Sequence, residues 1–255
     1  QTCALPISGF EAEEYNCKDW EDIYVPAHIQ MEGYDVPQYA NVQYPWEGHE
    51  EINPGEIPTH FNPTASYVKY FNVPEQMQGK RLFISFQGAE SGLALWLNGK
   101  FVGYSEDSFT PSEFELTEYV KEGENKLAAQ VFKWTASSWC EDQDFYRFSG
   151  IYRDVYLYTV PEVHVNDLRI RAIPDVSLAS ADFELTTKTW GKGQLKIVLS
   201  KEGNVVLEDV KEISDEDTFS WKVDAPVLWS AEDPQLYDLE LTVSDENGNV
   251  QEIIP

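Results

Sequence analysis

The sequence predicts an all-β protein built from two sandwiches, a larger jelly roll followed by an immunoglobulin-like sandwich. Apolar residues recur with a period of two along most segments from residue 65 onward, which is typical of half-buried strands. Gly, Pro, Asn and acidic residues separate these segments. No window keeps a helical period over three turns, and only Ser112 to Val120 is expected to form a short helical turn.

The first sandwich is expected to span residues 1–161. Its predicted strands cover residues 67–73, 82–86, 93–97, 101–104, 126–134 and 150–160. Asn98-Gly99 separates two of them and predicts a type I′ hairpin, because both central residues of that turn need a positive φ. Residues 25–59 hold many Pro, Gly, Asn and aromatic residues without clear strands, so we expect a long structured loop with a functional role.

The second sandwich is expected to span residues 162–255. It follows Pro161, which cannot donate a ladder hydrogen bond and therefore suits the end of a strand. Its predicted strands cover residues 163–170, 183–189, 195–199, 205–210, 219–223 and 236–243. Short strands at this spacing are typical of an immunoglobulin-like sandwich. The sequence lacks the Cys…Trp…Cys pattern of antibody domains, so we expect a relative of that fold.

Composition limits the classes of partner. The chain has 255 residues, of which 42% are hydrophobic and 14% aromatic, enough to bury about two domain cores. The 18 Lys and Arg residues oppose 45 Asp and Glu residues, which gives a formal net charge of -27. A surface of this charge repels phosphate, so we exclude nucleic acid and anionic membranes as partners. No apolar run approaches the ~18 residues that a membrane-spanning helix needs.

The cysteines and histidines do not indicate a metal site. Cys3, Cys17 and Cys140 lie far apart without a C-x-x-C pair, which argues against a zinc knuckle and a disulfide framework. A reducing compartment fits best, and we expect a cytoplasmic protein. The four histidines lack the spacing of known ligand motifs.

Both ends of the chain have unusual features. Residues 1–8 lack the basic and apolar regions of a signal peptide and resemble a translated sequencing adapter. We therefore expect this octapeptide, including Cys3, to be a non-native artefact. Residues 250–255 stop within an apolar alternation, so the natural protein is expected to be longer.

Several segments, taken together and in order, resemble the amino-terminal region of β-galactosidases of glycoside hydrolase family 2. They are Val25–Asp35, Tyr39–Pro45, Asn98–Tyr104, Glu122–Asn125, Glu141–Asp144, Arg147–Val155, Pro226–Ser230 and Leu236–Tyr237. The resemblance implies a galactose-binding-like jelly roll, an immunoglobulin-like domain and then a (β/α)₈ barrel. It also implies that the parent enzyme hydrolyses terminal β-D-galactosides such as lactose with retention of configuration.

The catalytic glutamates of that family belong to the barrel, and the acid/base glutamate follows an Asn. No Asn precedes a Glu anywhere in these 255 residues. The retaining mechanism needs two carboxyl groups about 5 Å apart, and the sequence offers no candidate pair. We therefore assign no catalytic residue here and expect this chain alone to be inactive.

Asn41 and Asp144 are the candidate substrate-binding residues. By resemblance, the Asn41 amide binds galactosyl hydroxyls, and the Asp144 carboxylate binds galactose and Na⁺ at a site shared with the barrel; the resemblance leaves room for Mg²⁺ in the barrel itself. An amide offers donors and acceptors to vicinal hydroxyls, and a carboxylate is a hard oxygen ligand. The Asp144 loop is expected to project away from the core of its own domain.

Structural roles for these residues stay open. Asn41 could instead occupy a left-handed turn position, and Asp144 could pair with Arg147 or Arg153. Trp46 and Trp139 are interpreted as core and loop aromatics rather than sugar platforms.

Two other functions also stay open. One is another family 2 glycosidase, a β-glucuronidase or β-mannosidase, although Glu141–Asp144 and Tyr39–Val42 favour the galactosidase branch. The other is a free-standing carbohydrate-binding module. For the leading hypothesis, the expected partners are a galactoside substrate, the enzyme's own barrel and other copies of the same chain in a homo-oligomer.

Overall fold

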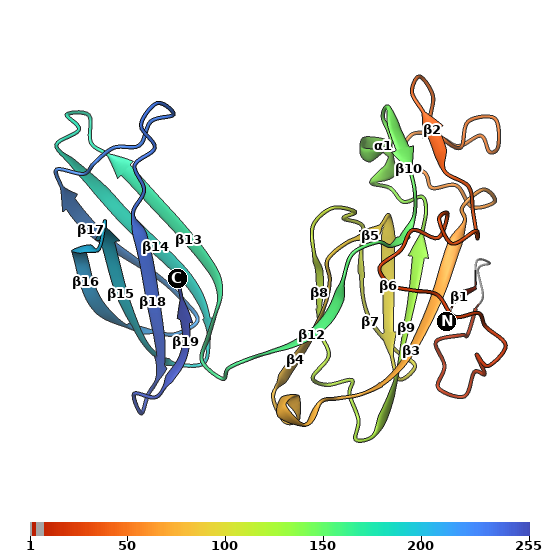
Figure 1. Ribbon diagram of the computed structural model, residues 1–255, viewed down its shortest axis with the longest axis horizontal. Coiled ribbons are helices and arrows are strands. Elements are labelled where there is room, and N and C mark those ends of the chain that lie inside the picture. The colour runs from red at the N-terminus through yellow and green to blue at the C-terminus, as the bar shows by residue number, and fades with distance from the viewer. Residues whose placement is uncertain (1, 4–7) are drawn as a thin grey trace. The chain divides into compact units, whose positions relative to one another are not determined.

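The computed structural model describes the backbone of residues 2–3 and all of residues 8–255 (Figure 1). The suspected artefact at residues 1–8 therefore lies mostly outside the described residues, as does the side chain of Cys3. The chain forms two compact units, Gln1–Thr159 and Val160–Pro255. Strands dominate both units, which confirms the predicted all-β class.

Unit 1 is a sandwich of a five-stranded and a three-stranded antiparallel sheet. The larger sheet has the order β1 (Thr2–Cys3), β3 (Thr64–Asn72), β9 (Glu124–Phe132), β6 (Gly92–Leu97) and β7 (Lys100–Ser105). The smaller sheet has the order β12 (Val155–Val160), β4 (Arg81–Phe86) and β8 (Ser112–Glu115). Two short pairs complete the unit: β2 (Gln38–Ala40) with β10 (Phe145–Arg147), and β5 (Ala89–Glu90) with β11 (Gly150–Ile151).

The core of unit 1 follows from the period-two pattern. Leu93, Leu95 and Leu97 of β6 point to one face, where they join a cluster with Leu82 and Ile84 of β4. Sheet-on-sheet packing of these aliphatic side chains is the main apolar contribution to the stability of this unit. The opposite face of the larger sheet is covered by a second cluster that contains Phe10, Cys17, Val68 and Ala128.

The connections of unit 1 agree with the sequence prediction at one turn and differ from it at three other places. Asn98 and Gly99 have φ values of 50° and 77°, which confirms the predicted hairpin. Residues 112–115 form strand β8, so the expected helical turn is wrong there; a turn is present only at Leu116–Val120. Pairing to β4 outweighs local preference for residues 112–115. The sequence analysis also did not predict two short helices, the 3-10 helix η1 (Glu75–Met77) and the α-helical turn α1 (Ser138–Glu141).

Unit 2 is a sandwich of a three-stranded and a four-stranded sheet. The first has the order β13 (His164–Pro174), β14 (Ser180–Trp190) and β17 (Glu216–Asp224); the second has the order β16 (Asn204–Ile213), β15 (Gly193–Lys201), β18 (Asp238–Asp245) and β19 (Val250–Ile254). Every predicted strand of this region is present. Leu185, Leu195, Ile197, Leu241 and Val243 are at most 1% exposed and form the core.

Two further observations concern the cysteines and the helices. Cys17 is buried and Cys140 is exposed, and both are free thiols. Within residues 2–3 and 8–255, no helix has the length and apolar character needed to cross a membrane.

Candidate functional site

Two distant loops meet at one end of unit 1, where α1, β2 and β10 gather (Figure 1). The antiparallel pairing of β2 with β10 sets Tyr39 opposite Tyr146 and Ala40 opposite Phe145. Asn41 follows β2 directly and Asp144 precedes β10 directly. The strand register therefore brings both candidate binding residues to the same place, although 105 sequence positions separate Tyr39 from Asp144.

Asp144 is the last residue of the short connection between α1 and β10. Its φ is 52°, a left-handed conformation in which Asp is one of the more tolerated residues, and its side chain is exposed. This exposure agrees with the expectation that the loop projects away from the core. The phenol of Tyr39 donates a hydrogen bond of 2.6 Å to Asp144 Oδ1, which raises the pKa of Tyr39.

Asn41 lies beside this pair. Its amide Nδ2 donates to the Tyr39 hydroxyl over 3.4 Å, a long contact that water or a ligand hydroxyl can replace. Tyr39 also stacks on Tyr146, with ring centroids 4.7 Å apart. The three polar side chains of Asn41, Tyr39 and Asp144 thus form a chain of hydrogen bonds at the surface.

A pocket of about 300 Å³ opens next to these residues. Loop residues from both segments line it: Asn41, Val42, Gln43, Tyr44, Glu47, Asp142, Gln143 and Asp144. Amide and carboxylate groups dominate this lining, and such groups recognise the hydroxyls of a sugar ring by hydrogen bonding.

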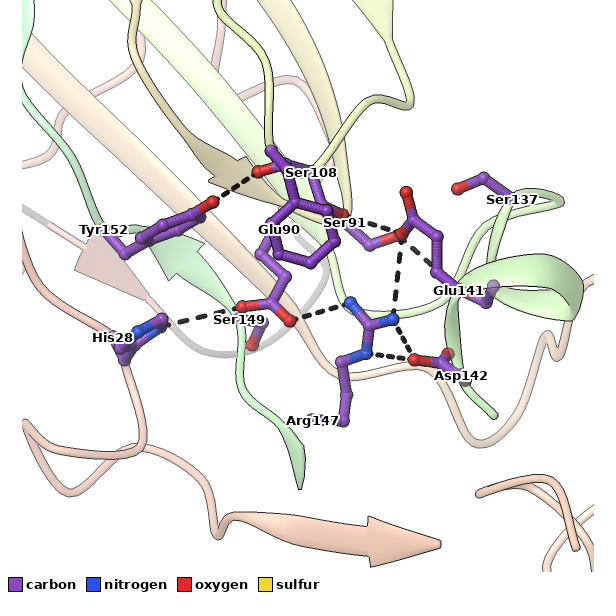
Figure 2. A network of polar contacts seen from close by, with 12 residues as sticks. His28, Glu90, Ser91, Ser108, Ser137, Glu141, Asp142, Arg147, Ser149 and Tyr152 are labelled. Carbon is purple, nitrogen blue, oxygen red and sulfur yellow. Dashed lines mark hydrogen bonds and ion pairs between the residues drawn. The ribbon is translucent and has the colours of Figure 1, made fainter. Parts of the chain in front are cut away.

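Buried Arg147 contacts acidic side chains on both sides of its guanidinium, and Figure 2 shows it between Glu90 and Asp142. The guanidinium is 1% exposed, and its Nη1 lies 2.8 Å from Glu90 Oε1. Nε and Nη2 both contact Asp142 Oδ1, and Nη2 lies 3.7 Å from Glu141 Oε2. The ion pairs of Arg147 within the described residues go to these three carboxylates, so the suggested pair with Asp144 is wrong.

Arg153 does not form an ion pair with Asp144 either. It donates from Nη1 to the backbone carbonyls of Phe109 at 2.9 Å and Gln87 at 3.3 Å. For the part of the chain that the structure describes, the hydrogen-bonding partner of the Asp144 carboxylate is Tyr39. Asp144 therefore keeps free acceptor capacity, since a carboxylate can accept about four hydrogen bonds.

Burial sets the electrostatics of the Arg147 cluster. It raises the pKa of Glu90 to about 7 against the opposing attraction of Arg147, and it lowers the pKa of Arg147. His28 lies 3.8 Å from Glu90 Oε2 and stacks on Tyr152 with ring centroids 5.0 Å apart. Burial also lowers the pKa of His28, which favours its neutral form.

Aromatic residues support the loop of residues 41–47 from within the unit. Trp46 is 1% exposed and packs against Tyr44 and Trp139, with ring centroids 5.0 Å apart in both cases. Trp139 donates from Nε1 to the carbonyl of Glu56 over 2.7 Å. These contacts agree with the interpretation of Trp46 and Trp139 as core and loop aromatics.

The sequence interpretation missed Tyr39, Tyr146 and the anchor Arg147. Tyr39 and Asn41 are two positions apart, so a strand would place both on one face; that signal was available but weak in a segment of three strand residues. The interaction of Arg147 with Glu90 depends on tertiary structure, because 57 positions separate the two residues.

A metal ion would need ligands from outside this group. No set of three or more His, Cys, Asp and Glu side chains that could hold a metal ion exists within residues 2–3 and 8–255. Asp144 offers a hard oxygen ligand with free lone pairs, which fits one position in a shared cation site.

Comparison with known proteins matches both units. A family model described as "Glycosyl hydrolases family 2, sugar binding domain" matches residues 3–161, and one described as "Glycosyl hydrolases family 2" matches residues 163–255. A β-galactosidase of Halalkalibacterium halodurans is 52% identical over 94% of the chain and 24% of its own length. A β-galactosidase of Clostridium acetobutylicum is 45% identical over 100% of the chain and 29% of its own length.

A solved structure shows the same fold. The β-glucuronidase 2 of Bacteroides uniformis superposes with a TM-score of 0.72 over 100% of this chain and 32% of its own, at 20% identity. The chain thus spans less than a third of the length of these relatives. On the match of its sugar-binding and following domains, the chain belongs to glycoside hydrolase family 2.

Proposed function

We propose that this chain is the non-catalytic amino-terminal part of a retaining β-galactosidase that hydrolyses terminal β-D-galactosides such as lactose. The 52% and 45% identity to proteins named β-galactosidase supports this choice within the family. The solved β-glucuronidase is only 20% identical, so its likeness supports the fold and not the substrate.

The observation that carries the proposal is the convergence of Asn41 and Asp144 at one polar pocket, with Tyr39 hydrogen-bonded to both. In the proposed enzyme, Asp144 accepts hydrogen bonds from galactosyl hydroxyls, and the Asn41 amide can both donate and accept. Tyr39 orients the Asp144 carboxylate through its 2.6 Å hydrogen bond. These residues bind and orient the sugar, while the two reacting carboxyl groups come from the proposed barrel.

We also propose Na⁺ as a cofactor, with Asp144 as one of its ligands. An alkali ion prefers oxygen ligands, and its bound positive charge would complement the carboxylate beside the sugar. The remaining ligands must come from outside the described residues, because these residues contain no complete ligand group. The free thiols of Cys17 and Cys140 support a further proposal, a reducing cytoplasmic location.

The test is hydrolysis of aryl β-D-galactoside, β-D-glucuronide and β-D-mannoside by the complete enzyme that contains these residues. We expect turnover of the galactoside. Asp144→Asn should lower kcat/KM by about tenfold to a hundredfold, the usual effect of losing hydrogen bonds to a charged group. Exposed Asp22 serves as the matched control, and Asp22→Asn should leave kcat/KM within about twofold.

Other outcomes would point to the alternatives. Preferential turnover of the glucuronide or the mannoside would replace the galactosidase with another family 2 glycosidase. Sugar binding without hydrolysis by the complete protein would favour a carbohydrate-binding module.

A further inference from the structure

We infer that Arg147 is a positioning residue for substrate binding: by bridging Glu90 and Asp142 it holds the loop of residues 142–147 in the conformation that presents Asp144. The inference rests on the proposed function, because it assumes that Asp144 binds the sugar. Arg147 acts through the loop and does not itself reach the substrate.

The guanidinium closes the loop from both ends. Arg147 lies in β10, after Asp144, whereas Asp142 lies before it; the two side chains are joined through Nε, Nη2 and Asp142 Oδ1. The segment between them, residues 143–146, is exposed and includes Asp144 with a φ of 52°. The planar guanidinium of Arg147 thus fixes the distance between the two ends of this segment.

Glu90 ties the closed loop to the sandwich. It lies in β5, which pairs with β11, and it accepts from Arg147 Nη1 at 2.8 Å. Glu90 and Asp142 are each 3% exposed, so solvent barely competes with these contacts. Figure 2 shows the guanidinium between the two carboxylates, with Glu141 on the same side as Asp142.

The composition of the cluster is poor for stability alone. Burying one guanidinium with the carboxylates of Glu90 and Asp142 carries a large desolvation penalty, and apolar side chains of the same volume often stabilise such a site as well or better. Burial raises the pKa of Glu90 to about 7, a sign of this penalty. The planar guanidinium instead defines the conformation of the loop, because its N–H donors point in fixed directions and can hold two carboxylates from different parts of the chain.

The test is a double-mutant cycle in the complete enzyme with Arg147→Lys, Asp144→Asn and both together. Lysine keeps the charge but cannot reproduce the planar fork. We expect Arg147→Lys to lower kcat/KM by about tenfold, and to weaken by a similar factor the binding of a thiogalactoside that is not hydrolysed. In the Asp144→Asn background, Arg147→Lys should change kcat/KM by less than about twofold, because its effect passes through Asp144.

The matched control is Arg81→Lys. Arg81 forms a bidentate ion pair with Glu115 in the same unit, in which Nε and Nη2 each donate to a carboxylate oxygen over 2.9 Å. It lies in β4 and does not line the pocket. This variant should leave kcat/KM and thiogalactoside affinity within about twofold. If Arg147→Lys does not fold, Glu90→Gln decides the question, since it removes the anchor charge without touching a residue of the pocket lining.

The outcomes separate the inference from the proposed function. An equal loss from Arg147→Lys in both backgrounds would mean a structural role and overturn the inference, as would unchanged kcat/KM in folded Arg147→Lys. Unchanged thiogalactoside affinity in Glu90→Gln would overturn it when Arg147→Lys cannot be folded. Full activity of Asp144→Asn would instead overturn the proposed binding site itself.

Discussion

Tyr39 and Asp144 are joined by a 2.6 Å hydrogen bond across 105 sequence positions, and the pairing of β2 with β10 makes this contact possible. Asp144 and Asn41 line the same polar pocket, and the Tyr39 hydroxyl is hydrogen-bonded to both side chains. Because the tyrosine donates its only hydroxyl proton, Asp144 is held by one bond and keeps its other acceptor positions for a ligand.

Removing that hydroxyl should weaken sugar binding without unfolding the protein. We expect Tyr39→Phe in the complete enzyme to weaken thiogalactoside binding by about 1 kcal/mol, roughly fivefold, since one hydrogen bond that orients Asp144 is lost. Calorimetric titration measures the affinity. Tyr24 is 85% exposed and Tyr24→Phe is the matched control, with no change expected. An unaltered affinity in Tyr39→Phe would argue against a role for this contact.

Glu50 should make the stability of unit 1 depend on pH. Its carboxylate accepts from the backbone N–H groups of Thr59, His60 and Phe61 at 2.8–3.0 Å, and these bonds lower its pKa from 4.5 to about 2. The folded carboxylate therefore binds its proton more weakly than the unfolded one. Its contribution is complete above about pH 4.5 and is lost as the pH falls toward 2.

Urea unfolding of this chain at several pH values checks the sign. Glu50→Gln should be less stable than the parent at pH 7, and the difference should narrow as the pH falls below about 4.5. Exposed Glu51 provides the matched control, Glu51→Gln, for which we expect no such trend. A stability difference between Glu50→Gln and the parent that stays constant down to pH 3 would contradict the lowered pKa of Glu50.

Trp46 should be essential for the stability of unit 1. It is 1% exposed and stacks on Tyr44, so Trp46→Ala would leave a large cavity beneath the loop of residues 41–47. We expect a loss of about 3–5 kcal/mol in the free energy of unfolding, measured by chemical denaturation. Trp229 is 61% exposed, and Trp229→Ala should change stability by less than about 0.5 kcal/mol. A small effect of Trp46→Ala would show that this loop closes over the cavity.

Gly193 should not tolerate a side chain. A Cβ there would overlap with the backbone carbonyl of Ser244 on the paired strand β18, and backbone atoms cannot move aside without disturbing the ladder. We expect Gly193→Ala to destabilise unit 2 by about 1–3 kcal/mol, as overpacking does. Thermal unfolding compared with Gln194→Ala, an exposed neighbour on the same strand, gives the measurement. Equal stability of the two variants would refute the steric argument.

The isolated chain should not hydrolyse a chromogenic β-galactoside. Family resemblance assigns both catalytic glutamates to the barrel, and the sequence holds no Asn followed by Glu. A spectrophotometric assay with purified chain tests this. Turnover at the rate of an intact enzyme would contradict the proposal.

The sequence by itself determined the class of fold. Alternating Leu93, Leu95 and Leu97 can bury one face only as a strand, and Asn98-Gly99 can take positive φ values at little cost, so these choices are local. The predicted strands of unit 2 are present for the same reason, with differences at their ends, whereas β19 (Val250–Ile254) was not among them. The expectation at residues 112–115 failed because pairing with β4 is a long-range contact that no local pattern records.

The tertiary structure decided the geometry of the candidate site. Resemblance named Asn41 and Asp144, but no period or spacing could place them in one pocket, because that depends on the register of β2 against β10. The partner of Arg147 was likewise ambiguous among many acidic residues of similar chemistry. Burial resolved the ambiguity: a desolvated guanidinium requires the carboxylates that the fold brings within reach, and those are Glu90 and Asp142 rather than exposed Asp144.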